Sequence, residues 1–171
     1  MENVPETYFF EDDGNIPNSK YPLIIYKAAF SETGNPGAQW LEQKFESNNW
    51  TNSWRNGVFP YHHYHSITHE VLGVYSGNAL LQLGGANGKK IQVAAGDIII
   101  IPAGVGHKNI ESSKDFAIVG AYPNGMEYDL MKGKANERPL ADENISKVPF
   151  PDKDPLLGKN NGLIKFWNNQ D

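Results

Sequence analysis

The fold of this chain is decided by one stretch, which reads Gly57-Val-Phe-Pro-Tyr-His-His-Tyr-His-Ser-Ile-Thr-His-Glu-Val-Leu-Gly-Val-Tyr-Ser-Gly77. It holds four of the five histidines, beside a glutamate and among aromatic and β-branched residues typical of strands. The fifth histidine, His107, follows a glycine-rich turn. Two β-segments are therefore expected to bring the imidazoles together, and this concentration predicts a metal site.

Composition limits the protein in which that site lies. A chain of 171 residues with 39% apolar residues suits one domain, so we expect residues 1–171 to form a single domain with its core at about residues 52–125. The 15 basic and 20 acidic residues leave a net charge of -5, which gives no reason to expect nucleic acid or an anionic membrane as a partner. There is no cysteine, so a metal must be held by nitrogen and oxygen.

Targeting signals are not evident. The N-terminal residues lack the basic and apolar regions of a secretory signal, and no apolar run approaches the ~20 residues of a membrane span. These features predict a cytoplasmic protein.

From residue 57 to about residue 123 the sequence consists of short β-runs joined by glycine turns, which is typical of an antiparallel sandwich or barrel. Residues 80–83 and 90–93 flank a turn in which Asn87-Gly88 is expected to supply the positive φ of a hairpin. Residues 98–101 are four isoleucines in succession, as expected of a strand covered on both faces.

The N-terminal part predicts two strands and a helix. Residues 7–10 and 21–30 are rich in aromatic and β-branched side chains, which favour strands. A helix is expected to open near Gly34, with Asn35 as its N-cap and Pro36 in its first turn. Its apolar face, which is expected to cover a sheet, is formed by Trp40, Leu41 and Phe45.

Two further segments have weaker patterns. Residues 49–56 are polar and predict a loop, whose Trp50, Trp54 and Arg55 either rim a cavity or simply pack. Residues 126–171 predict extended segments laid over the core or across a partner subunit. No helix is expected in this tail, because Pro149 limits one near residue 142 to a turn or two.

Strand geometry separates candidate ligands from their neighbours. Side chains two positions apart share a face, so His63 and His65 are expected to point into the barrel while His62 and Tyr64 point away. Glu70 lies an odd number of positions after His65 and reaches the same interior only if residues 66–68 turn or bulge.

Two ligand sets stay open at this point, because His69 replaces Glu70 if the bulge falls one residue differently. His107 arrives from the second β-segment in either case. Three imidazoles and one carboxylate suit one divalent transition ion, namely Fe, Mn, Ni, Co or Zn, with one or two positions left for water or substrate.

The spacing of these residues resembles the cupin superfamily. The first cupin motif, G-x5-H-x-H-x3,4-E-x6-G, is matched by Gly57, His63, His65, Glu70 and Gly77. The second, G-x5-P-x-G-x2-H-x3-N, is matched by Gly96, Pro102, Gly104 and His107, but Glu111 stands where its final asparagine is expected. The run from His63 to Gly73 and the later Gly120-Ala-Tyr-Pro also resemble small single-domain bacterial cupins of the uncharacterised YjlB type.

The resemblance implies an all-β double-stranded β-helix, or jelly roll, with metal held by His63, His65, Glu70 and His107. We expect a metal-dependent enzyme, a dioxygenase-like oxidoreductase or an isomerase, that acts on a small polar or carboxylate substrate. The alternative is a non-catalytic cupin that binds a sugar or another small molecule around a structural metal. The resemblance also implies a homodimer.

Overall fold

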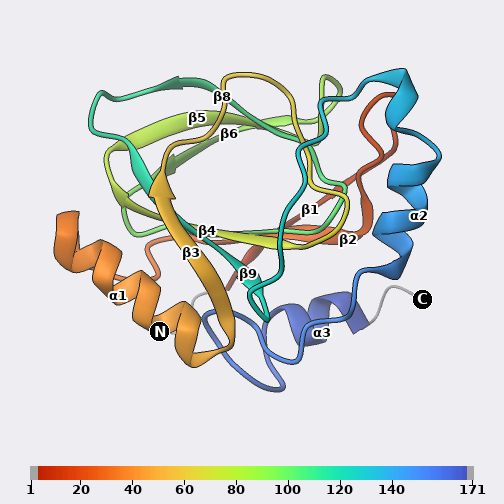
Figure 1. Cartoon of the computed structure of the whole chain (residues 1–171). Helices are drawn as coiled ribbons and strands as arrows, with labels where there is room; N and C mark the ends of the chain where they lie inside the picture. Colours follow the sequence, from red (N-terminus) through yellow and green to blue (C-terminus); the bar gives the residue numbers. More distant parts are fainter. Residues whose placement is uncertain (1–3, 169–171) are drawn as a thin grey trace.

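The computed structural model describes residues 4–168, which form mainly two antiparallel β-sheets (Figure 1). Six strands make the larger sheet, in the order β1-β2-β7-β4-β9-β3, and three make the smaller one, in the order β6-β5-β8. The strands are β1 (Glu6–Phe10), β2 (Ser19–Tyr26), β3 (Trp50–Asn56), β4 (Glu70–Ser76), β5 (Asn78–Leu83), β6 (Lys89–Ala94), β7 (Ile98–Ile101), β8 (His107–Ser112) and β9 (Ala117–Pro123). The predicted all-β jelly roll is confirmed.

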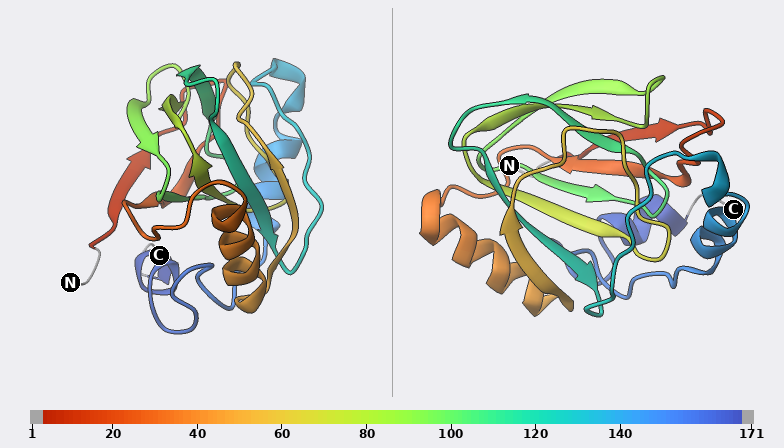
Figure 2. Two further views of the ribbon diagram at one scale, coloured as in Figure 1. Left: turned by 90° about the vertical axis from the view of Figure 1, so that its left-hand side faces the viewer. Right: turned by 45° about the horizontal axis from the view of Figure 1, so that its top comes forward.

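The two sheets face each other across a shared interior (Figures 1 and 2). Leu72 of β4 and Ile99 and Ile101 of β7 point into this interior and pack in one apolar core. Their neighbours Val71 and Ile100 point to the outer face of the larger sheet and belong to a second core. The isoleucine run is therefore buried on both faces, as predicted.

Helices cover that outer face. Helix α1 (Gly34–Ser47) and the C-terminal helix α3 (Leu163–Asn168) lie against the larger sheet, and Leu41, Phe45 and Trp167 are buried there (Figures 1 and 2). The expected helix is present, but Thr33 and not Asn35 occupies its N-cap, without a side-chain bond. Across residues 4–168, no helix combines the length and apolar character required to span a bilayer.

Two local predictions were wrong. The segment expected to be a loop is the edge strand β3, which pairs with β9; an edge strand tolerates polar side chains because one side of it faces solvent. Trp50 in this strand is buried, so of the two alternatives left open for it, packing is the one found. In the β5–β6 turn, positive φ falls on Gly84 and Gly85 instead of Asn87-Gly88.

The tail is less extended than predicted. It contains a short turn η1 (Ala135–Glu137), helix α2 (Leu140–Lys147) and α3. Pro139 precedes α2 and Pro149 follows it, so these prolines bracket the helix instead of breaking it.

Asp154 fastens this tail to the sheet. Its buried carboxylate accepts a hydrogen bond from the Tyr26 hydroxyl of β2 at 2.6 Å. The other donors are the backbone N–H groups of Leu156, Leu157 and Leu163, at 2.7, 2.9 and 2.9 Å. Every partner is a donor, which suits an ionised carboxylate.

Candidate metal centre

The chain around His63 and His65 is held from both sides, although it belongs to no long strand. His63 and His107 exchange backbone hydrogen bonds of 3.2 and 2.9 Å, and Tyr64 and Met131 exchange two of 2.9 Å. Successive residues thus bond to opposite neighbours, as in the centre of a sheet. His63 and His65 consequently point to the interior, while Tyr64 packs outside with Ile16.

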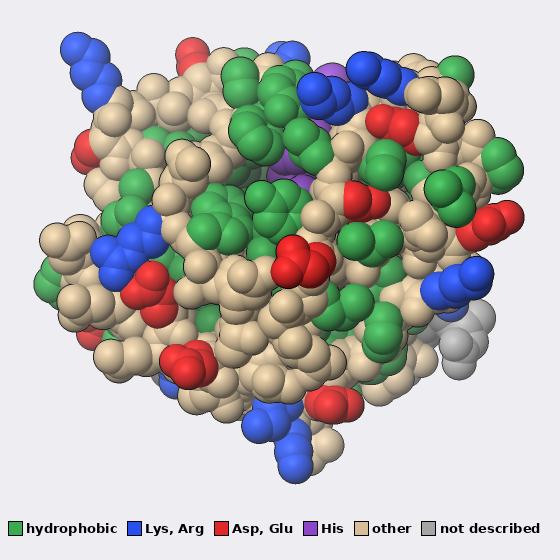
Figure 3. Space-filling view, in the orientation of Figure 1, with side chains coloured by type: hydrophobic (Ala, Val, Ile, Leu, Met, Phe, Trp, Pro, Cys, Tyr) green, Lys and Arg blue, Asp and Glu red, His purple; other side chains and the backbone are tan. Residues whose placement is uncertain are grey.

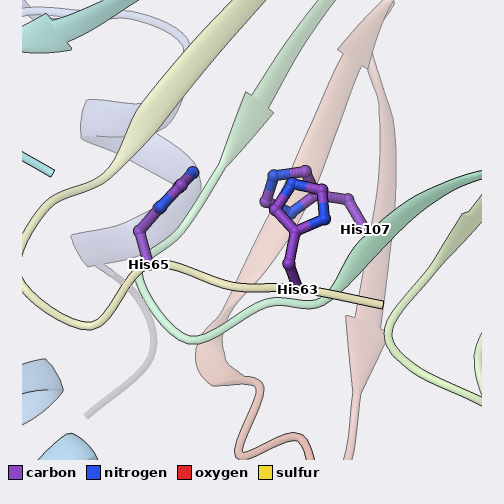
Figure 4. A group of neighbouring side chains, drawn as sticks. All are labelled: His63, His65 and His107. Atoms are coloured by element: carbon purple, nitrogen blue, oxygen red, sulfur yellow. The ribbon is translucent and has the colours of Figure 1, made fainter. Parts of the chain in front are cut away.

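The three imidazoles converge at one point. Each of His63, His65 and His107 offers a ring nitrogen, and these nitrogens lie within 4.8 Å of one another. Figure 4 shows the rings turned toward one another, His63 and His65 from one segment and His107 from the start of β8. All three are buried, and Figure 3 shows histidine at the bottom of a hollow in the surface.

Backbone carbonyl groups fix the orientation of each ring through its Nδ1 atom. The carbonyl oxygens belong to Tyr61, Asp129 and Val105, which contact His63, His65 and His107 respectively; the first lies at 2.9 Å and the last at 3.2 Å. A carbonyl only accepts, so Nδ1 carries the hydrogen and the lone pair of Nε2 is free. Metal-binding histidines have this arrangement.

Glu70 adds a carboxylate from the other sheet. It is the first residue of β4, and its Oε1 atom lies 3.4 Å from Nε2 of His65 and 3.4 Å from Nε2 of His107. The chain bends at Ser66 and Ile67, which absorbs the odd spacing from His65. The predicted turn is therefore present, and the donors come from both sheets.

Burial and mutual charge set the protonation of this group. Burial, with a contribution from His107, lowers the pKa of His63 to about 3. Burial opposes a charge on His65 as well, but Glu70 outweighs it and the pKa of His65 is raised. Burial would raise the pKa of Glu70, yet His65 and His107 lower it below its ordinary value. The carboxylate is therefore ionised at neutral pH.

The two remaining histidines do not join the group. His62 is half-buried and lies outside it. His69 is buried on the opposite face, 4.8 Å from Trp167 between ring centroids, and burial lowers its pKa to about 3. The open alternative, with His69 in the place of Glu70, is not the arrangement found.

Tyr122 and Trp54 line the cavity together with Glu70. The Tyr122 hydroxyl accepts a hydrogen bond from Trp54 Nε1 at 2.7 Å and is close enough to Glu70 to feel its charge. Burial and the charge of Glu70 raise the pKa of Tyr122 well above its ordinary value. Tyr122 therefore stays protonated at neutral pH.

Asp129 is a supporting residue that the sequence did not indicate. Besides accepting from His65, it binds Ser66 through its carboxylate, to the backbone N–H at 2.7 Å and to the hydroxyl. It lies in the tail, outside both histidine segments, and only its fold position reveals this role.

A cavity of about 320 Å³ opens above the histidines. Most of its wall is apolar and comes from Trp54, Val58, Phe59, Leu72, Ile118 and Tyr128. Arg55 also borders it, so of the two alternatives left open for Trp54 and Arg55, bordering a cavity is the one found.

The donor set fits a divalent transition ion. Three imidazole lone pairs and one ionised carboxylate are nitrogen and oxygen ligands of the type that Zn, Fe, Mn, Co and Ni accept. The cavity leaves one side of the group accessible.

Comparison with known proteins identifies the family. The sequence model described as "Cupin domain" matches residues 54–119. The chain is 46% identical over 168 residues to the uncharacterized protein YjlB of Bacillus subtilis (strain 168), covering 98% of this chain and 99% of that protein. The chain belongs to the cupin family. This cupin and YjlB match along nearly their whole lengths.

More distant likenesses are found among solved structures. Acireductone dioxygenase from Bacillus anthracis, with cadmium in its active centre, is 16% identical with a TM-score of 0.38, covering 53% of this cupin and 61% of that chain. Oxalate decarboxylase from Bacillus subtilis is 18% identical with a TM-score of 0.39, and the match covers 69% of this cupin and 29% of that chain. This cupin spans less than two thirds of either chain, and likenesses this weak support no inference about activity.

Proposed function

We propose that this cupin binds one divalent transition ion through His63, His65, Glu70 and His107 and acts as a metal-dependent enzyme on a small molecule, by dioxygenase-like oxidoreductase chemistry. The observation that carries the proposal is the convergence of three ring nitrogens within 4.8 Å beside a buried carboxylate, at the base of an open cavity. Fe, Mn, Ni, Co or Zn suits these donors.

A bound ion would supply Lewis-acid or redox chemistry at its open positions. The chain's own residues contribute orientation and environment. Carbonyl groups hold the three rings through Nδ1, and Tyr122 lines the cavity beside Glu70. The apolar wall offers water few hydrogen-bonding partners beside the reacting atoms.

One observation favours the second candidate, a binding cupin without catalysis in which the metal is structural or orients a ligand. The Tyr122 hydroxyl accepts a hydrogen bond from Trp54, and burial with the charge of Glu70 raises its pKa well above the ordinary value, so this hydroxyl is a poor proton donor at neutral pH. No separate acid or base is therefore assigned.

Two expectations remain proposals beside this one. Association into a homodimer is tested by sedimentation at micromolar concentration, where a monomer alone would contradict it. A cytoplasmic location is tested by fractionating cells that express the protein.

The decisive experiment separates the two functions. Protein purified without added metal is first examined by elemental analysis, and about one transition ion per chain is expected because four donors converge. Oxygen uptake is then screened with the Fe(II)-loaded protein, with His63→Ala as the control. Turnover lost in the control supports the enzyme, ligand retention without turnover supports the binding protein, and no metal even after addition contradicts both.

A further inference from the structure

Three polar side chains that border the cavity already bind other groups of the protein. The Arg55 guanidinium donates to both carboxylate oxygens of Glu42, at 3.0 and 2.7 Å. The side-chain oxygen of Asn56 accepts from the N–H of Gly57, and the indole N–H of Trp54 is engaged with Tyr122. The Arg55 charge and the Trp54 N–H are therefore already engaged within the protein.

The remaining wall is apolar. Val58, Leu72 and Ile118 contribute aliphatic surface, and Trp54 contributes an indole. A ligand with many hydroxyl groups would bury them here without hydrogen-bond partners, which is unfavourable. A ligand whose buried part has few hydrogen-bonding groups fits this wall better.

Two exposed aromatic rings stand at the mouth. Phe59 is 48% exposed and contacts His63 edge-on, with ring centroids 5.2 Å apart. Tyr128 is 49% exposed and contacts His65 edge-on at 5.4 Å. Figure 3 shows hydrophobic side chains above and below the hollow in which histidine is visible.

Each of these rings is backed by another ring. Phe59 stacks on Tyr61 with centroids 5.1 Å apart and an interplanar angle of 12°. Tyr128 stacks on Tyr122 at 5.3 Å and 19°. Stacking holds the two exposed rings in place, so each presents a pre-oriented aromatic surface.

The charge of the metal site limits which group of a ligand can bind the ion. A divalent ion on three neutral imidazoles and one carboxylate leaves a positive charge uncompensated, and the nearby Arg55 is already neutralised by Glu42. A head group with a single negative charge and two adjacent oxygens matches one or two open metal positions.

We propose that the ligand of this site is a small, flat, aromatic or otherwise unsaturated molecule with one singly charged oxygen-chelating head group. Its head group binds the metal, and its body lies against Phe59 and Tyr128. This inference rests on the proposed metal function and narrows its substrate class: sugars and dicarboxylates fit the wall poorly.

The test compares two chelators that share a head group. The full-length chain is loaded with cobalt(II) and titrated with benzohydroxamate or acetohydroxamate, and the visible absorption of cobalt reports binding. Because only the body differs between the two, we expect benzohydroxamate to bind at least ten times more tightly. Malonate, a dicarboxylate, is expected to bind more weakly than benzohydroxamate.

Variants assign the preference to the aromatic mouth. Phe59→Ala and Tyr128→Ala should each reduce the benzohydroxamate preference several-fold with cobalt content unchanged. Tyr128→Phe keeps the aromatic ring and should therefore retain the preference for benzohydroxamate. Ile110→Ala, which removes an exposed apolar side chain outside the cavity lining, should also leave it unchanged.

The possible failures are distinguishable. Equal affinity for the two hydroxamates, with cobalt absorption changing in both titrations, overturns the aromatic ligand while leaving an open metal site intact. The same holds if malonate binds more tightly than benzohydroxamate. Absence of cobalt binding overturns the proposed metal function and this inference with it. Bound cobalt whose absorption responds to neither hydroxamate overturns this inference and leaves only a structural metal.

Discussion

The Nδ1 atom of His69 accepts a hydrogen bond from the backbone N–H of Ala103, 2.8 Å away. Ala103 lies in the turn that leads to His107, so His69 supports a candidate ligand from the far side of the sheet. With Nδ1 accepting, Nε2 carries the hydrogen, and it has no hydrogen-bond partner among the described residues. The ring instead lies near the aromatic rings of Tyr21 and Trp167.

Replacing His69 should therefore separate stability from metal binding. We expect His69→Ala to lower the free energy of unfolding of the metal-free protein by about 2–4 kcal/mol, because it removes a buried ring and leaves the Ala103 N–H unpaired. Metal content should remain near one ion per chain. Glu70→Ala should instead weaken metal binding by roughly tenfold or more, because it removes a proposed ligand. Urea unfolding and metal titration measure the two effects, and a larger loss of metal affinity at His69 than at Glu70 would contradict the assignment.

The neighbouring pair His62 and His63 gives a second matched comparison. His63→Ala should lose most of the bound metal, whereas His62→Ala should keep it, since only His63 turns its ring into the group. His65→Ala and His107→Ala should behave like His63→Ala. Titration of each variant with one divalent ion is the measurement, and equal losses at His62 and His63 would show that a histidine-rich segment binds metal without the proposed geometry.

Removal of the metal should lower the melting temperature. An ion that binds only the folded state stabilises it, by about 2.7 kcal/mol when its free concentration is 100 times the dissociation constant. A thermal melt with and without chelator measures the change. His63→Ala, with its site impaired, serves as the control and should melt at nearly the same temperature in both solutions. An unchanged melt of the natural sequence after verified metal removal would argue against an ion bound in the folded state.

Asp154 should be essential for the docking of the tail. Asp154→Asn replaces one acceptor oxygen with a donor that faces other donors, so we expect a loss of about 2–4 kcal/mol in unfolding free energy. Asp152→Asn, at an exposed position two residues earlier, should change stability little. Chemical denaturation compares the two variants, and similar stabilities would contradict the anchoring role.

The ion pair between Asp12 and Arg138 should appear in the acid stability. The hydrogen bond that Asp12 accepts from Arg138 lowers the pKa of Asp12 from 3.8 to about 2. Because the folded value is the lower one, the stabilisation is present above about pH 4 and is lost as the pH falls toward 2. Asp12→Asn should therefore melt below the natural sequence at pH 5, and this difference should shrink by pH 2. A difference that stays constant would exclude linkage to this carboxyl group.

Strand periodicity made much of the site predictable. Because alternate side chains point to opposite faces, the positions of His63, His65 and Glu70 inside, and of Tyr64 and His69 outside, followed once a turn after His65 was assumed. The assignment of residues 1–171 to one domain stays a prediction.

The remainder depends on contacts between distant parts of the chain. Nothing local indicates that Asp129 reaches His65, because its partners are 63 and 64 positions earlier. Trp167 lies in a short helix, and its side chain is buried against the sheet near Pro22. The indole N–H of Trp167 donates a hydrogen bond to the Pro22 carbonyl. Such contacts leave no periodic pattern in a single sequence.

Residues 126–131 lie outside both cupin motifs, yet Asp129 receives the Nδ1 hydrogen of His65 and Met131 pairs with Tyr64. Related proteins can therefore differ in this segment and retain all four donors while changing how firmly and at what angle one imidazole is held. Sequence changes that alter metal preference would then occur in residues 126–131 and not at the donors, in a segment that a motif search does not examine.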